Sequence, residues 1–112
     1  IRALNRARRE NTALQQTSQL RFIAIEDGNV IAFVKESVDQ SNIVVAAIAL
    51  TRDPHEFWLP LGDVQVGLPG NRRNVVAVEN LMTGERYPVE WGGIRPRIDP
   101  VRDPAVLFRC LA

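Results

Sequence analysis

The chain has 112 residues, of which 46% are hydrophobic and 24% charged, and its formal net charge is +1. This length fits one domain, and the apolar share is sufficient for one core, which excludes a disordered chain. A single cysteine excludes a disulfide scaffold, and no apolar run approaches the roughly 20 residues of a membrane helix, so no membrane partner is predicted. The first residue is Ile1 rather than Met, so we expect a piece of a longer protein.

The first residues have the pattern of a short basic helix. Apolar Ala3, Leu4 and Ala7 form one stripe, while four arginines and one glutamate give residues 1–11 a net charge of +3. The sequence pI is near 8.2, whereas nucleic-acid-binding domains usually have a pI above about 9 and a broad basic face. We therefore predict a solvated helix face and no nucleic-acid partner.

From Leu20 onward, short apolar segments alternate with turn residues. The run Ile43–Leu50 is apolar on both faces, which is typical of a central, covered strand. Asp27-Gly28 predicts a hairpin turn, because glycine adopts positive φ at little cost. Seven or eight short strands without long helices between them predict an all-β fold, an antiparallel β-sandwich of Greek-key type. The predicted strands are Leu20–Ile25, Val30–Glu36, Ile43–Leu50, Glu56–Leu61, Asn74–Asn80, Arg86–Trp91, Ile94–Ile98 and Ala105–Leu111.

The residue types that carry catalysis or metal binding are sparse. His55 is the single histidine and no G-x-S-x-G motif accompanies it, so we interpret it as an exposed polar residue. Cys110 lies among apolar neighbours and is predicted to be buried, and one Cys with one His cannot form the usual zinc sites. Gly67–Gly70 lacks the Lys-Ser/Thr of a phosphate loop, and Glu85 and Glu90, although a glycosidase needs two carboxylates, are predicted to be solvated. We predict no catalytic, metal-binding or cofactor-binding residue in this chain, and no cofactor.

Two tryptophans leave carbohydrate binding open, because indole faces can stack on the apolar faces of sugar rings. Trp91 is in phase with Tyr87 and Val89 along a predicted strand, so we predict that it lies in the core. Trp58 is out of phase with the apolar Phe57, so we predict that it is exposed or covered by a partner domain.

Several segments together resemble one enzyme superfamily. The segment Leu4–Leu14 is similar to the last helix of the catalytic (β/α)8 barrel in the α-amylase superfamily, which a C-terminal antiparallel β-sandwich follows. Three further segments, Leu50–Leu61, Asn80–Tyr87 and Asp99–Arg109, resemble the tail of the α-1,4-glucan:maltose-1-phosphate maltosyltransferases. The resemblance covers essentially the whole chain.

The resemblance implies that residues 1–18 are the remnant of the last barrel helix with its connector, and that residues 19–112 are a C-terminal β-sandwich that covers the barrel. It implies a cytoplasmic parent enzyme that transfers maltosyl units from maltose 1-phosphate to α-1,4-glucans, through an Asp nucleophile and a Glu acid/base. Those residues belong to the barrel before Ile1, so we assign no catalytic residue here. The implied partners are the barrel of the same parent chain and the α-glucan; a homodimeric parent is left open.

Three alternatives stay open at this point. The chain could be the tail of another superfamily enzyme, such as an amylase or a trehalose-forming isomerase. It could be a carbohydrate-binding module that uses Trp58, or a free-standing interaction domain. The coding sequence upstream of Ile1 would separate these alternatives, because only an enzyme tail requires a preceding barrel.

Overall fold

The computed structural model describes residues 6, 9–10, 19–37, 42–67 and 70–112. Arg6, Arg9 and Glu10 have helical backbone, in line with the predicted N-terminal helix. The other residues of that helix and of its connector, including the predicted apolar stripe, lie outside the described residues, so the division at residue 18 remains a prediction.

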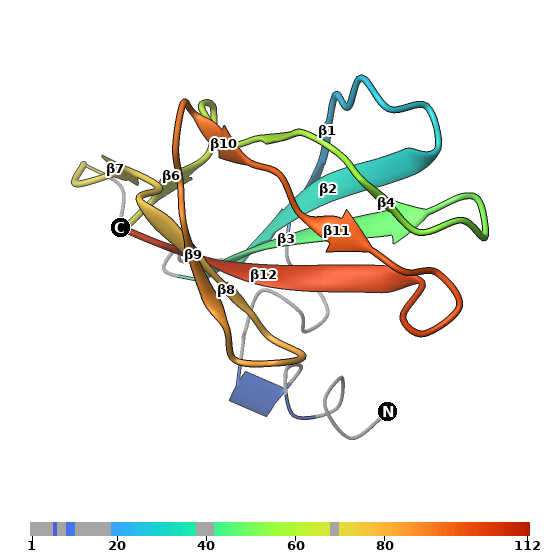
Figure 1. Cartoon of the computed structure of the whole chain (residues 1–112). Coiled ribbons are helices and arrows are strands. Elements are labelled where there is room, and N and C mark those ends of the chain that lie inside the picture. The colour runs from blue at the N-terminus through green and yellow to red at the C-terminus, as the bar shows by residue number, and fades with distance from the viewer. Residues whose placement is uncertain (1–5, 7–8, 11–18, 38–41, 68–69) are drawn as a thin grey trace.

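The described chain beyond this segment is all-β and antiparallel, as predicted (Figure 1). The second and the last predicted strands have the bounds that the alternation of apolar residues indicated. The strands are β1 (Gln19–Ile23), β2 (Val30–Glu36), β3 (Ile43–Ala49), β4 (His55–Glu56), β5 (Leu59–Pro60), β6 (Gln65–Val66), β7 (Arg73–Asn74), β8 (Ala77–Asn80), β9 (Arg86–Pro88), β10 (Gly93–Ile94), β11 (Arg97–Ile98) and β12 (Ala105–Leu111).

Six of these strands form the main sheet, in the order β1-β2-β3-β12-β8-β9. The last strand of the chain lies between β3 and β8, so neighbours in the sheet are far apart in the sequence. Strand β3 is central and its first five residues are buried, which confirms the prediction for this apolar run. In β2, the alternate residues Val30, Ala32 and Val34 are at most 5% exposed and face the core.

Three two-stranded ladders, β10-β5, β11-β4 and β6-β7, complete the sandwich. Figure 1 shows β10, β4 and β11 on one side of the main sheet, and the core lies between these ladders and the sheet. The strand count exceeds the prediction because three predicted strands, Glu56–Leu61, Asn74–Asn80 and Ile94–Ile98, are each divided, and because β6 forms where no strand was predicted. Pro96 has no N–H group and separates β10 from β11, while its carbonyl still accepts a hydrogen bond from Phe57 N at 3.1 Å.

The turn between β1 and β2 forms as predicted but for a different physical reason. Gly28 is not among the residues with positive φ. Instead Asp27 closes the turn: its side-chain Oδ1 accepts from Asn29 N at 2.9 Å, and its carbonyl accepts from Val30 N at 3.2 Å. The aspartate, rather than the freedom of the glycine, therefore stabilises this hairpin.

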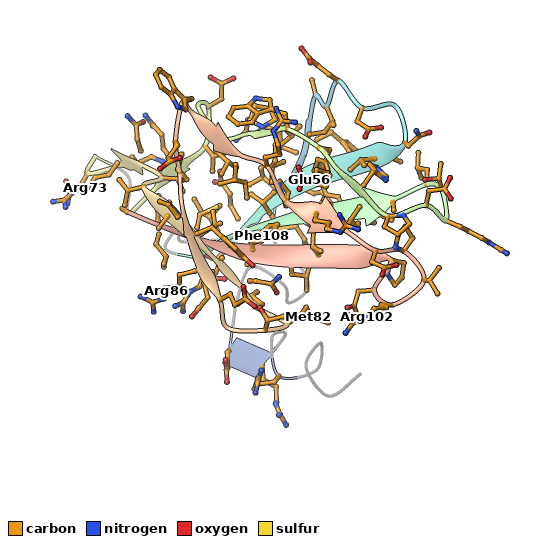
Figure 2. The ribbon with its side chains drawn as sticks, in the orientation of Figure 1. Glu56, Arg73, Met82, Arg86, Arg102 and Phe108 are labelled. Carbon is orange, nitrogen blue, oxygen red and sulfur yellow. The ribbon has the colours of Figure 1, made fainter. Side chains whose placement is uncertain are left out.

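The face of the main sheet that points away from the ladders is called the outer face below. It has a small apolar cluster of its own, in which Val44, Ala46 and Leu107 are buried. Figure 2 shows Phe108 on the inner side of β12 and Met82 on its outer side. The helical residues of the N-terminal segment, blue in Figure 1, lie on the side of the sheet opposite to β10.

Candidate functional site

An open cavity of about 480 Å³ lies between β9, the turn that leads into β10, and the connection from β4 to β5. Its volume falls in the range of small-molecule sites, roughly 300–1,000 Å³. We call it the aromatic cavity and define it by the side chains that carry its chemistry. These are Trp58, Tyr87, Glu90, Trp91, Arg95 and Arg97.

Trp91 corrects the prediction from the sequence. It is 96% exposed rather than in the core. Strand β9 ends at Pro88, and the chain then turns between Glu90 and Gly93, which exchange backbone hydrogen bonds at 3.0 and 3.2 Å. The two central residues, Trp91 and Gly92, have φ of 59° and 79°, as in the type I′ turn. A residue in such a turn no longer follows the alternation of a strand, so Trp91 projects from the tip.

Trp58 has the opposite phase to its neighbours, as predicted: Phe57 and Leu59 are at most 2% exposed, whereas Trp58 lines the cavity. Its ring lies against the backbone of Gly93, where an added Cβ would come within 2.7 Å of Cζ2 of the indole. On the same ring lies Arg95, whose guanidinium carbon is 5.9 Å from the ring centroid, a cation–π distance. The indole is therefore held by contacts with the turn and with a charged side chain.

Tyr87 forms another wall of the cavity. Its ring packs edge-on against Phe108, with centroids 6.4 Å apart and planes at 83°. Its hydroxyl donates a hydrogen bond to Glu85 Oε2 at 2.7 Å. This bond, with partial burial and the nearby negative charge, raises the pKa of Tyr87 above its ordinary value, so the phenol is neutral and fixed in position at physiological pH.

The rim of the cavity has charges of both signs. Glu90, Arg95 and Arg97 are exposed. No ion pair joins these three side chains to one another or to any other residue that the structure describes. Their hydrogen-bonding groups are therefore available to a ligand, with donors on the two arginines and acceptors on the glutamate.

The structure places His55 and Cys110 in structural positions, and His55 is half-buried rather than exposed as predicted. His55 Nδ1 lies 2.8 Å from the carbonyl oxygen of Asp53, and its Nε2 lies 3.2 Å from Asp27 Oδ2. The ring thus links β4 to the β1–β2 turn, a contact that the sequence did not reveal because Asp27 is far away along the chain. Cys110 is buried in β12, as predicted, and burial raises its pKa to about 12, so its sulfur is an unreactive thiol.

The remaining predicted candidates do not converge on a site. Glu85 and Glu90 are both exposed, in agreement with the expectation of a solvated position. The segment Gly67–Gly70 is described only at its two ends. Within the described part of the chain, no group of three or more His, Cys, Asp or Glu side chains could hold a metal ion. The same residues contain no helix that is long and apolar enough to cross a membrane.

A second surface feature lies on the outer face. Leu20, Phe22, Ile31 and Ile48 are 51%, 67%, 39% and 37% exposed, and the strand register brings them together. Phe22 is paired with Phe33 across β1 and β2, and their rings make an edge contact at 6.2 Å. Ile31 is paired with Ile48 across β2 and β3. We call these residues the apolar patch; such contiguous exposed apolar groups mark interaction surfaces.

Comparisons of sequence and of structure find proteins that are similar to this chain. No protein-family model matches the chain. It is 34% identical over 97% of its length to the α-1,4-glucan:maltose-1-phosphate maltosyltransferase of Rhodospirillum rubrum, and 39% identical over 86% of its length to that of Pseudomonas aeruginosa. The chain spans 16% and 15% of these two enzymes. Its fold matches part of the crystal structure of an Anoxybacillus α-amylase, with a TM-score of 0.66, 16% identity, and coverage of 96% of this chain and 21% of the amylase.

The structure thus defines the chain as an antiparallel β-sandwich domain with the fold of part of an α-amylase. Within that class, its similarity is to the α-1,4-glucan:maltose-1-phosphate maltosyltransferases, which confirms the resemblance that the sequence alone indicated.

Proposed function

We propose that the chain is the non-catalytic C-terminal domain of an enzyme that transfers maltosyl units from maltose 1-phosphate to α-1,4-glucans. The observation that carries this proposal is the pattern of similarity: 97% of the chain matches a maltosyltransferase, of which it spans only 16%. The contacts of His55 with Asp53 and Asp27, and the protonated state of the buried Cys110 thiol, suit a structural role for these two side chains.

The apolar patch supports the second part of the proposal, that the outer face covers the catalytic barrel of the same parent chain. Phe22 is 67% exposed although it lies in a regular strand beside Phe33. Burying such a side chain contributes about 1.5–3 kcal/mol, so the patch has a clear reason to be covered in the parent. Residues 1–18 would then continue from the barrel helix into β1, and the parent would be a cytoplasmic enzyme.

The test compares one substitution in two contexts. Phe22→Asp should lower the stability of the isolated chain by no more than about 1 kcal/mol, because Phe22 is already 67% exposed and loses chiefly its cross-strand contact with Phe33. In the parent enzyme the same change should lower the melting temperature by several degrees, since it places a charge in the domain interface. Val101→Asp, which alters a residue 77% exposed in the loop before β12, is the matched control and should change neither.

Activity is measured alongside, as phosphate release from maltose 1-phosphate with glycogen as the acceptor. The parent should release phosphate and the isolated chain should not. A parent that hydrolyses α-glucan but does not consume maltose 1-phosphate would assign the domain to an amylase-type enzyme instead. Equal melting temperatures of the wild-type and Phe22→Asp parents would contradict the assignment of the outer face.

A further inference from the structure

We propose that the aromatic cavity is a binding site for an α-1,4-glucan chain on this domain, with Trp91 as its stacking platform. The choice of this sugar rests on the proposed function, because it is the acceptor in the name of the relatives. The existence of a site for a neutral, polyhydroxylated ligand rests on the cavity itself.

The first observation is the backbone of Trp91. A bulky residue with φ of 59° is an outlier, because the left-handed conformation brings Cβ close to the following carbonyl oxygen. Asn, Asp or Gly would occupy this turn position without such strain. The indole gains no compensating burial, since it is 96% exposed. A strained and fully exposed aromatic residue is a signature of a binding position rather than of folding.

The second observation is which other side chains line the cavity. Trp58, Tyr87 and Phe108 also line it, so four aromatic side chains surround one open volume. Two of them are fixed in place: Trp58 by Gly93 and Arg95, and the Tyr87 hydroxyl by Glu85. Rigid aromatic walls lose little conformational entropy when a ligand binds, and they offer flat apolar faces to sugar rings.

The third observation is the mixed charge of the rim. Glu90 supplies acceptors, and Arg95 and Arg97 supply donors, without ion pairs to the described residues. Sugar hydroxyls donate and accept hydrogen bonds, so they can use both kinds of group.

The fourth observation is the position of the cavity. It is formed by β9, by the turn before β10 and by the segment before β5, whereas the apolar patch lies on β1, β2 and β3 of the outer face. Figure 1 shows β10 and the N-terminal helical residues on opposite sides of the main sheet. A parent barrel that covers the outer face would therefore leave the cavity open to a glucan chain.

The experiment titrates maltoheptaose into the 112-residue chain and into the parent enzyme, with calorimetry and tryptophan fluorescence as readouts. The wild-type chain should bind in the millimolar range or tighter. Trp91→Asn, which suits the positive φ of the turn, should weaken binding by at least about tenfold, a loss of about 1.4 kcal/mol. Trp91→Phe, which keeps an aromatic ring, should retain most of the affinity. Val101→Asn removes an exposed apolar side chain elsewhere and is the matched control.

The outcomes separate this proposal from the one on which it rests. A parent that transfers maltosyl units to glycogen, together with a chain that does not bind maltoheptaose, would overturn the glucan site alone. Binding that is unchanged in Trp91→Asn would also overturn it. Conversely, a chain that binds maltoheptaose through Trp91, in a parent that does not use maltose 1-phosphate, would contradict the proposed function and leave the site standing.

Discussion

The outer face and the aromatic cavity are two exposed surfaces of one sandwich, and they are built in opposite ways. The apolar patch lies on regular strands, where register places one side chain beside the next and all of them are aliphatic or Phe. The cavity combines residues of short strands, such as Tyr87 of β9 and Arg97 of β11, with residues between strands. The positive φ of Trp91 and the missing N–H group of Pro96 interrupt the regular strands at this place. A flat, regular surface suits the burial of another domain, whereas an irregular, concave surface suits a small flexible ligand.

The largest expected effect comes from a substitution in the core, which lies beneath both surfaces. Phe57 is 2% exposed in the core between the main sheet and the ladders. Phe57→Ala should lower the free energy of unfolding by about 3–5 kcal/mol, because it leaves a cavity that the packed layers cannot fill. Urea unfolding followed by circular dichroism measures this loss. A loss below about 1 kcal/mol would show that the two layers do not depend on this contact.

The next largest effect is expected from a substitution that alters the aromatic cavity but not the apolar patch. Gly93→Ala should destabilise the chain by about 1–3 kcal/mol, since the new Cβ would lie 2.5 Å from the Leu59 carbonyl oxygen and 2.7 Å from Trp58 Cζ2. The displaced indole should also weaken maltoheptaose binding, while the interface of the parent is unaffected. Gly62→Ala is the matched control, because a Cβ at Gly62 meets no atom within 4 Å. Equal melting temperatures for the two variants would contradict the packing described for Trp58.

Features that depend on residues close together in the sequence could be predicted, whereas features that depend on strand pairing could not. The alternation in β2 and the two-sided apolar run of β3 were predictable, because burial imposes a period on nearby residues. The patch was not, since the pairing of Phe22 with Phe33 depends on register. Trp91 was predicted in the core because it continues the alternation of Tyr87 and Val89. The prediction was wrong because the turn begins at Glu90, before the Gly-Gly pair, and ends that alternation.

A smaller effect concerns the shared interior at high pH. Burial raises the pKa of Cys110 from 9.0 to about 12, so the folded chain retains this proton where the unfolded chain loses it. Stability is therefore complete below pH 9 and should fall between about pH 9 and 12, with a limiting slope of about 1.4 kcal/mol per pH unit. Denaturant unfolding at pH 8 and pH 10.5 measures the difference. Cys110→Ala should lose less stability over this interval; an equal loss would mean that the thiol is not desolvated.

The smallest expected effect has the opposite sign. Trp91→Asn should stabilise the isolated chain by about 1 kcal/mol, because asparagine tolerates the positive φ that Trp91 adopts. Thermal unfolding, with Val101→Asn as the control, measures this gain. A variant that is more stable but binds glucan less well would sharpen the contrast between the two surfaces, because only the cavity would then trade stability for binding. A destabilised Trp91→Asn would show that the indole contributes to folding.

The position of β12 in the main sheet has a consequence for how the domain folds during synthesis. This last strand pairs with β3 through Ala105–Arg109 and with β8 through Phe108–Leu111. Until β12 has left the ribosome, no strand joins β1-β2-β3 to β8-β9. One hydrogen-bonding edge of the apolar strand β3 is then unpaired. The sheet therefore closes only after the residues of β12 are made, through contacts between distant segments that form slowly and leave an aggregation-prone edge in the meantime.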